Sequence, residues 1–151
     1  ASSVMATDLS DEMLVIAREV LSDLKHVEVA KASVDDSRFP SDEFDTAIII
    51  NALHLVADPQ AGVKEMHRVL KPGGRLTVAS FTGRYVTREE KNALASRFIE
   101  RFGEPPHAVN FKTEMVEKMM KDEGFVIEES EVLGESVKAV YVVGGKWRPV
   151  S

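Results

Sequence analysis

The first residue whose position suggests chemistry is Asp8, which follows a short apolar stretch and precedes Ser10, a residue that favours a helix start. In an open α/β sheet the carboxyl ends of the parallel strands form the ligand crevice, and an acidic side chain there can accept hydrogen bonds from both hydroxyls of a ribose. The competing interpretation is that Asp8 only caps the helix, because aspartate is a strong capping residue. Taken alone, the position of Asp8 favours the cap.

Two further polar residues, Asn51 and His54, follow the apolar run Phe44–Ile50. A buried amide without a partner costs about 1 to 3 kcal/mol, so Asn51 is expected to bond to a cofactor or substrate, or to cap a helix. His54 is a candidate general base, because imidazole changes its charge near neutral pH. A packed or capping histidine is the competing interpretation, and the sequence alone favours it.

Metal and thiol chemistry is not expected. The chain has no cysteine, which excludes disulfides, thiolate metal sites and a cysteine nucleophile. His54 and Asp58 are four residues apart, as metal ligands on a helix can be, but Pro59 starts a new helix and no third ligand is evident. We therefore expect no metal site.

Charge and composition limit the function classes. With 19 Lys and Arg against 25 Asp and Glu, the net charge is −6, which argues against nucleic acid as the main partner. With 44% hydrophobic and 29% charged residues, the 151-residue chain is expected to form a single soluble domain over 1–151. No stretch has the roughly 20 apolar residues of a membrane span, and no signal peptide is visible, so a cytoplasmic location is expected.

Short apolar segments alternate with amphipathic ones, which is typical of a layered α/β fold with a mainly parallel sheet. Strands are expected at 4–7, 27–32, 44–50, 75–81, 125–133 and 137–143. Helices are expected at 10–24, 58–70, 87–102 and 113–123. The last two strands are separated by three residues, too few for a parallel crossover, so they should form an antiparallel hairpin.

Two local features refine this pattern. The segment Phe44–Ile50 is rich in isoleucine and ends in the continuous apolar run 47–50, which predicts a strand near the centre of the sheet with helices on both faces. The sequence Lys71-Pro72-Gly73-Gly74 predicts the end of the preceding helix and a type II turn, in which Gly73 takes a positive φ.

Three stretches carry a resemblance to a known family: TDLSDEML at 7–14, ASVDDSRFPSDEFDTAIIINALHLV at 32–56, and DPQAGVKEMHRVLKPGGRLTVASF at 58–81. They resemble the class I S-adenosylmethionine-dependent methyltransferases, and most closely the methyltransferase type 11-like enzymes of ubiquinone and menaquinone biosynthesis. The final helix and hairpin also match. The resemblance implies a Rossmann-like α/β sheet with helices on both faces, and methyl transfer from S-adenosylmethionine to a small-molecule acceptor, with S-adenosylhomocysteine as product.

For the cofactor, the resemblance implies that Asp8 binds the ribose and that Leu9 and Met13 pack near the adenine. Apolar and thioether groups suit the faces of a flat base. Ordinary helix core is an equally good interpretation of Met13. The combination of motifs favours the ribose role of Asp8 over the cap.

Ser33 and Val34 occupy the positions where the family usually has an acidic residue and an alanine that contact the edge of the adenine. A serine hydroxyl can accept a hydrogen bond from the exocyclic amine, although this bond is weaker than one to a carboxylate. Asp35 or Asp36 could substitute if the loop shifts, and a solvated acidic turn is the competing interpretation of both.

For the acceptor, the resemblance places Asn51, His54 and Phe81 in the pocket that adjoins the cofactor, with Asn51 able to contact either molecule. Many such enzymes mainly place the acceptor in line with the sulfonium methyl, which needs no dedicated base. We therefore assign no catalytic residue.

The family's glycine-rich turn, GxGxG, is missing, because all nine glycines lie at or after Gly62. The family's strand order places the missing first strand between the strands that begin at Val4 and Phe44. Without it, those two strands pair directly or a slot opens in the sheet. Three explanations compete. The first is a longer protein whose first strand and helix, about 30 or more residues, precede Ala1. The second is a strand donated by a second copy, as in a strand-exchanged homodimer, or by another chain. The third is a short relative that has lost cofactor binding.

Two other functions remain open. One is a non-catalytic binding or scaffold protein with the same fold. The other is a nicotinamide-dependent oxidoreductase, because Asp8 after a strand would also suit the ribose of that cofactor. The terminal hairpin and the phrase RVLKPGG count against the oxidoreductase.

Overall fold

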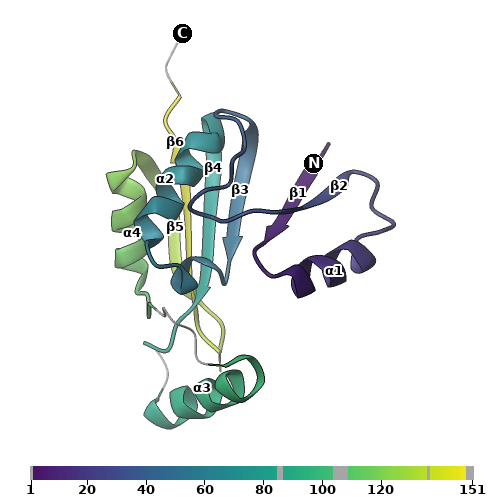
Figure 1. Cartoon of the computed structure of the whole chain (residues 1–151). Helices are drawn as coiled ribbons and strands as arrows, with labels where there is room; N and C mark the ends of the chain where they lie inside the picture. Colours follow the sequence, from purple (N-terminus) through teal and green to yellow (C-terminus); the bar gives the residue numbers. More distant parts are fainter. Residues whose placement is uncertain (1, 85–86, 104–108, 136, 149–151) are drawn as a thin grey trace.

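The structure is a computed structural model that describes residues 2–84, 87–103, 109–135 and 137–148 (Figure 1). The strands are β1 Val4–Asp8, β2 Val27–Lys31, β3 Phe44–Ile50, β4 Leu70–Phe81, β5 Phe125–Leu133 and β6 Ala139–Lys146. The helices are α1 Asp11–Val20, the 3₁₀ turn η1 Leu53–Leu55, α2 Pro59–Val69, α3 Arg88–Phe102 and α4 Thr113–Asp122. This order confirms the expected alternation and the α/β fold class.

The strand β4 begins earlier than expected. The sequence suggested a turn at 71–74 followed by a strand from Arg75, but β4 starts at Leu70, directly after α2. Leu70 is the register partner of Phe44, and the register then shifts before Thr46. The turn is therefore an irregularity inside the strand, and Gly73 within it has the expected positive φ, at 84°.

The strands form two separate groups. β1 and β2 are a parallel pair, and a second sheet has the order β3-β4-β6-β5, in which β3 and β4 are parallel and β6 is antiparallel to both β4 and β5. The expected terminal hairpin is confirmed. β1 and β3 do not pair, so of the two alternatives left open by the sequence the slot is the one present, and Figure 1 shows the β1–β2 pair lying beyond the β3 edge of the larger sheet.

β3 is therefore an edge strand of its described sheet, and the expectation that it lies near the centre is wrong. The backbone N–H of Asn51 donates to the carbonyl of Ala79 on β4, at 2.8 Å. The backbone groups of successive residues point alternately to the two sides of a strand. Since the N–H of Asn51 points to β4, the N–H and C=O groups of Ile48 and Ile50 are directed to the other side, toward the slot. A strand with such an unpaired row of groups is a template for pairing with another strand.

The main core lies between the larger sheet and helices α2 and α4. It contains apolar residues from β3, η1, α2, β4, α4, β5 and β6, together with Phe111. On the opposite face of β3, Ile48 and Ile50 are 61% and 65% exposed, so no described helix covers that part of the sheet, contrary to expectation. The apolar side chains of β3 are typical of a strand buried on both faces, but the described residues bury only one of its faces.

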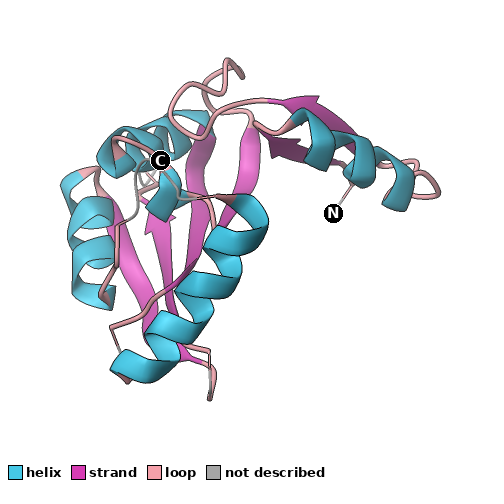
Figure 2. Cartoon of the chain, turned by 60° about the horizontal axis from the view of Figure 1, so that its bottom comes forward, coloured by secondary structure: helices cyan, strands magenta, loops and turns pink. Residues whose placement is uncertain are grey.

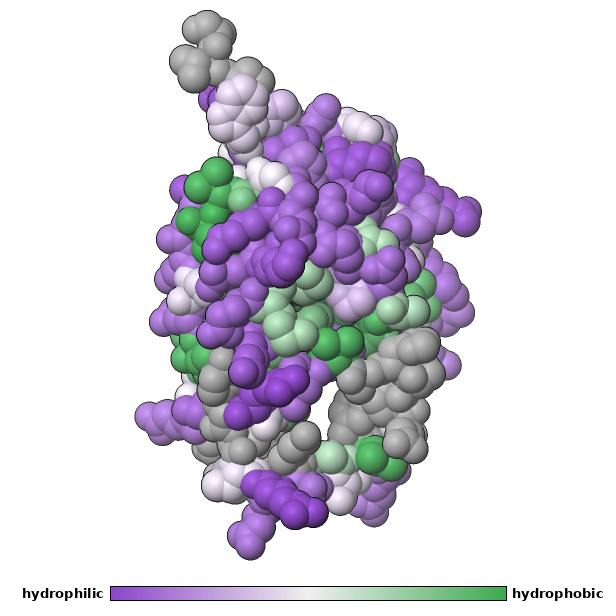
Figure 3. All heavy atoms as spheres, turned by 90° about the vertical axis from the view of Figure 1, so that its left-hand side faces the viewer, coloured by the Kyte–Doolittle hydropathy of each residue, from purple (hydrophilic) through white to green (hydrophobic). Residues whose placement is uncertain are grey.

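Helices nevertheless lie on both faces of the fold. The chain moves from β1 to β2 away from the larger sheet, whereas it moves from β3 to β4 in the opposite direction, into that sheet. Because the connections between parallel strands are right-handed, α1 and α2 fall on opposite faces of the fold (Figure 2). The surface over α4 and β5 is mostly hydrophilic, with small apolar patches (Figure 3). In the part of the chain that the structure describes, no helix is long and apolar enough to cross a membrane.

Candidate active site

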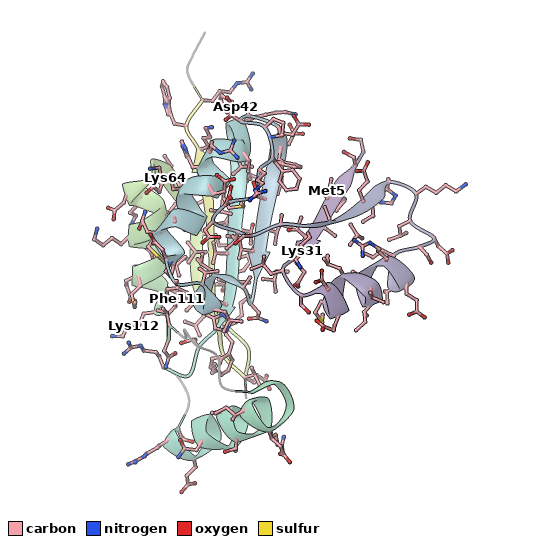
Figure 4. The ribbon with its side chains drawn as sticks, viewed as in Figure 1. Met5, Lys31, Asp42, Lys64, Phe111 and Lys112 are labelled. Atoms are coloured by element: carbon pink, nitrogen blue, oxygen red, sulfur yellow. The ribbon has the colours of Figure 1, made fainter. Side chains whose placement is uncertain are left out.

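The candidate residues gather where the parallel strands end. Asp8 ends β1, Ser33 follows β2, Asn51 follows β3, and Phe81 ends β4. Carboxyl ends of parallel strands form the ligand crevice of open α/β sheets. Figure 4 shows Lys31 at this end of the β1–β2 pair, where its ammonium group lies 2.8 Å from both carboxylate oxygens of Asp11.

Asp8 is not the cap of α1. Ser10 is the N-cap, and its hydroxyl accepts the backbone N–H of Met13 at 3.3 Å. Oδ1 of Asp8 instead accepts the backbone N–H of Ser10 at 2.8 Å. This bond orients the exposed carboxylate, while Oδ2 makes no hydrogen bond to any described residue. One oxygen is thus held in place and the other is available to a ligand.

Leu9 and Met13 are exposed apolar side chains beside Asp8. Leu9 is 56% and Met13 is 49% exposed, whereas Leu14 is the buried residue of α1. The helix-core interpretation of Met13 is therefore wrong for the described structure. A flat apolar ligand next to Asp8 would find two side chains free to pack on it.

Ser33 and Val34 have different environments. The Ser33 hydroxyl bonds to the carboxylate of Asp35, which occupies it within the loop. Val34 is partly buried and packs against the core, where Gly62 lies beneath it. A Cβ at Gly62 would lie 3.4 Å from Cγ1 of Val34 and 3.0 Å from Cδ1 of Leu53, so this glycine permits the close approach. The adenine-edge roles of Ser33 and Val34 stay predictions.

Asn51 links the ends of β3 and β4. Its Oδ1 accepts the backbone N–H of Phe81 at 2.8 Å, and its φ of 51° is in the left-handed region. Left-handed conformations of non-glycine residues concentrate at functional sites, and asparagine tolerates them better than most residues. Because Ala52 is the N-cap of η1, the helix-cap interpretation of Asn51 is not borne out. The amide oxygen is satisfied by protein, which leaves the amide N–H groups for a ligand.

His54 is packed and hydrogen-bonded, as the simpler interpretation expected. Its Nδ1 lies 2.9 Å from the hydroxyl of Ser80, and its carbonyl accepts the backbone N–H of Val109. Burial lowers the pKa of His54 below its ordinary value, which favours the neutral ring. Sequence reasoning missed Ser80, although a serine that alternates with Leu76 and Val78 on the buried face of β4 is a signal.

A second group that the sequence did not reveal lies just beyond β4. Thr82 is completely buried, and its hydroxyl donates to the carbonyl of Phe111 at 2.6 Å. The backbone N–H of Gly83 donates to Oδ1 of Asn110 at 2.8 Å. These contacts fasten the segment after β4 to the segment that leads into α4, and the backbone bond from Val109 to the His54 carbonyl fastens the same segment to η1.

The loop that leads to β3 is secured on α2 by a charged pair. Arg68 binds Glu65 through two nitrogens, at 2.8 and 2.7 Å, and Ser37 donates to the same carboxylate. The Arg68 guanidinium holds the pKa of Glu65 at about 2, well below its ordinary value. This pair positions the chain next to Ser33 and Val34. Among the residues described by the structure, no group of three or more histidines or acids could hold a metal ion.

The family model and the curated relatives that this chain matches are methyltransferases. A family model described as "Methyltransferase domain" matches residues 1–78. A "Demethylmenaquinone methyltransferase" of Clavibacter sepedonicus is 39% identical over 79 residues, which are 52% of this chain and 32% of that protein. The "Ubiquinone/menaquinone biosynthesis C-methyltransferase UbiE" of Enterobacter sp. (strain 638) is 34% identical over 106 residues, 67% of this chain and 42% of the relative. The chain thus spans about a third to two fifths of these relatives.

Solved structures share the fold. A SAM-dependent methyltransferase of Methanosarcina mazei superposes with a TM-score of 0.77 at 19% identity, covering 97% of this chain and 83% of that one. A "SAM-dependent methyltransferase, possible histamine N-methyltransferase" of Thermotoga maritima gives a TM-score of 0.69 at 25% identity, with 93% and 72% covered. The first likeness extends over nearly all of this chain, including the terminal hairpin.

Proposed function

Because this chain belongs to the methyltransferase domain family, we propose that it contributes to the transfer of a methyl group from S-adenosylmethionine to a small-molecule acceptor. S-adenosylmethionine is the cofactor of this family. The observation that carries the proposal is the oriented carboxylate of Asp8 at the carboxyl end of β1, with one oxygen held by Ser10 and the other available. That arrangement suits a ribose with two neighbouring hydroxyls.

The residues around Asp8 fit the rest of the nucleoside. Leu9 and Met13 offer apolar surface for the faces of the adenine. Ser33 and Val34 lie after the neighbouring strand β2, where they can contact the edge of the adenine ring. On the other side of the slot, the amide N–H groups of Asn51 can donate to the cofactor or to the acceptor.

The bound cofactor supplies an electrophilic methyl group on a sulfonium. The chain's own part is to hold the acceptor in line with it, since proximity and orientation alone can supply much of the rate. We place the acceptor beside Asn51, His54 and Phe81, where β3 and β4 end. The names of the curated relatives support a quinone-like ring as acceptor, and small-molecule chemistry agrees with the net charge of −6, which disfavours nucleic acid.

Part of the cofactor site is absent from these residues. No glycine precedes Gly62, and the unpaired edges of β1 and β3 leave room for a strand between them. We therefore propose that a parallel strand with a glycine-rich turn completes the site. The greater length of the relatives supports a strand from the same polypeptide, and exchange with a second copy is the alternative.

Binding measurements test this function. We would titrate S-adenosylhomocysteine and NAD⁺ by calorimetry into the 151-residue chain and into the encoded polypeptide that contains it. Binding of S-adenosylhomocysteine alone supports the methyltransferase, and binding of NAD⁺ alone supports the oxidoreductase. If neither ligand binds even the longest encoded polypeptide, the scaffold interpretation replaces the enzyme.

A further inference from the structure

The contact between Ser80 and His54 joins the core to the acceptor side of the crevice. Ser80 is completely buried on the face of β4 that also carries Leu76 and Val78, and its hydroxyl lies 2.9 Å from Nδ1 of His54. His54 belongs to η1, which follows β3. A hydroxyl on an otherwise apolar face is costly to bury unless it is bonded, so the imidazole is the group that permits a serine at this position.

The direction of this hydrogen bond follows from the inventory of donors. In the described part of the chain, Nδ1 of His54 is the only hydrogen-bond partner of the Ser80 hydroxyl. If Nδ1 carried a proton, it would donate to Ser80, and the serine hydrogen would have no acceptor, at a cost of about 1 to 3 kcal/mol. Ser80 is therefore the donor. Nδ1 uses its lone pair, and the proton of the neutral ring is on Nε2.

The second ring nitrogen reaches the surface. Among the described side chains that are not exposed, no buried nitrogen or oxygen lacks a partner. Nε2 of His54 makes no hydrogen bond to a described residue, so it must be accessible to solvent. His54 lies three residues after Asn51, in the turn beyond the carboxyl end of β3, which is the end of the strand where the acceptor is proposed to bind.

We propose that Ser80 is a positioning residue that fixes His54 as the Nε2–H tautomer, and that this N–H donates to an oxygen of the methyl acceptor. The oxygen is that of a carbonyl, a phenolate or a carboxylate, since each has a lone pair to accept the bond. This inference rests on the proposed function. His54 is then not the general base, because one ring nitrogen is engaged by Ser80 and the other carries a proton.

The tautomer can be measured without any ligand. Long-range proton–nitrogen correlation spectra of the ¹⁵N-histidine-labelled chain distinguish Nδ1–H from Nε2–H rings, and H54Q assigns the His54 signals. We expect a single Nε2–H tautomer at pH 7.5, with His26 and His67 as internal references. An Nδ1–H tautomer at His54 overturns the proposal.

Matched variants test the part played by Ser80. S80A removes the donor and should give a mixture of both tautomers, whereas S80T keeps the hydroxyl and should restore the single form. S37A is the control, because Ser37 is also a buried hydroxyl but bonds to Glu65. It should leave the His54 signals unchanged. If S80A fails to fold, the unmodified chain and S80T still decide the tautomer, and an unchanged tautomer in folded S80A overturns the positioning role.

The donor role is tested with 1,4-naphthoquinone, which has carbonyl oxygens, against naphthalene, which has none. The 151 residues contain no cysteine, so the quinone cannot form a thiol adduct with this part of the polypeptide. In the longest polypeptide that binds S-adenosylhomocysteine, the quinone should shift the Nε2 and Hε2 resonances of His54, and naphthalene should not. If S-adenosylhomocysteine binds but both probes act alike, the donor role is overturned while the methyltransferase proposal stands. If S-adenosylhomocysteine does not bind, the function fails independently of the tautomer.

Discussion

The amide oxygen of Asn51 accepts the backbone N–H of Phe81 at 2.8 Å, so a single side chain ties the end of β3 to the end of β4. The residue holds this position with a φ of 51°. Both facts place a specific demand on the side chain. It must be short enough to tolerate the left-handed conformation and must offer an acceptor to the neighbouring strand.

Substitution of Asn51 should separate these two demands. Asn51→Ala loses the acceptor and strains the backbone, and should lower the free energy of unfolding by about 2 to 3 kcal/mol. Asn51→Gly loses the acceptor but fits the positive φ, so its loss should be smaller, about 1 kcal/mol. Urea denaturation measures both values. Equal stability of the alanine and glycine variants would show that the conformation is not strained.

Asp8 should be required for cofactor binding rather than for folding. We expect Asp8→Ala to weaken S-adenosylhomocysteine binding at least tenfold, about 1.4 kcal/mol, because a carboxylate that accepts ribose hydroxyls is removed. Calorimetry on the longest encoded polypeptide gives the dissociation constant. Asp11→Ala is the matched control, since Asp11 is also acidic and close by but is paired with Lys31. An unchanged constant for the Asp8 variant would remove Asp8 from the site.

Glu65 should make the fold sensitive to acid. Its pKa is about 2 in the folded protein and near 4.5 when unfolded, so the stabilisation is complete above the unfolded value and is lost as pH falls from about 5 to 2. Because the Arg68 side chain is 38% exposed, solvent screening reduces this contribution to on the order of 1 to 2 kcal/mol. In Glu65→Gln this part of the pH dependence should vanish in urea titrations at several pH values. Asp45→Asn, which alters an exposed ion pair, should leave it intact.

The two sides of β3 should differ in hydrogen exchange. The backbone groups of Ile48 and Ile50 face the slot, whereas those of Ile49 face β4. In the 151-residue chain the amides of Ile48 and Ile50 should therefore exchange much faster than that of Ile49, as NMR can resolve.

The concentration dependence of this exchange distinguishes the occupants of the slot. Protection that appears only at high concentration indicates a strand from a second copy. Protection only in the longer polypeptide indicates a strand from the same chain. Slow exchange of Ile48 and Ile50 at every concentration in the 151-residue chain would mean that β1 and β3 pair directly, contrary to the structure.

Much of the fold could be predicted because it depends on local pattern. The isoleucine-rich stretch at 44–50 and the proline after Asp58 each specify an element through local chemistry, and the structure has both. The short link between the last two strands specified the antiparallel hairpin, although β6 begins at Ala139 and not at 137 as expected. Sequence also placed Asp8 and Asn51 at strand ends. The positions of the glycines also showed that the family's glycine-rich turn is missing from these residues, since Gly62 is the first glycine.

The tertiary structure decided the features that depend on contacts between residues distant in the sequence. Whether Ile48 is covered depends on a strand or helix from elsewhere, and the continuous apolar run gave the same signal in either case. The sequence offered both Ser10 and Asp8 as the cap of α1, and only the geometry decided for Ser10 and showed that Asp8 keeps one oxygen available. The contact between Ser80 and His54 joins residues 26 positions apart, whose distance is set by the parallel pairing of β3 and β4. The sequence by itself therefore determined the order of elements and the family, whereas hydrogen-bond partners and burial, which depend on groups distant in the chain, were decided only by folding.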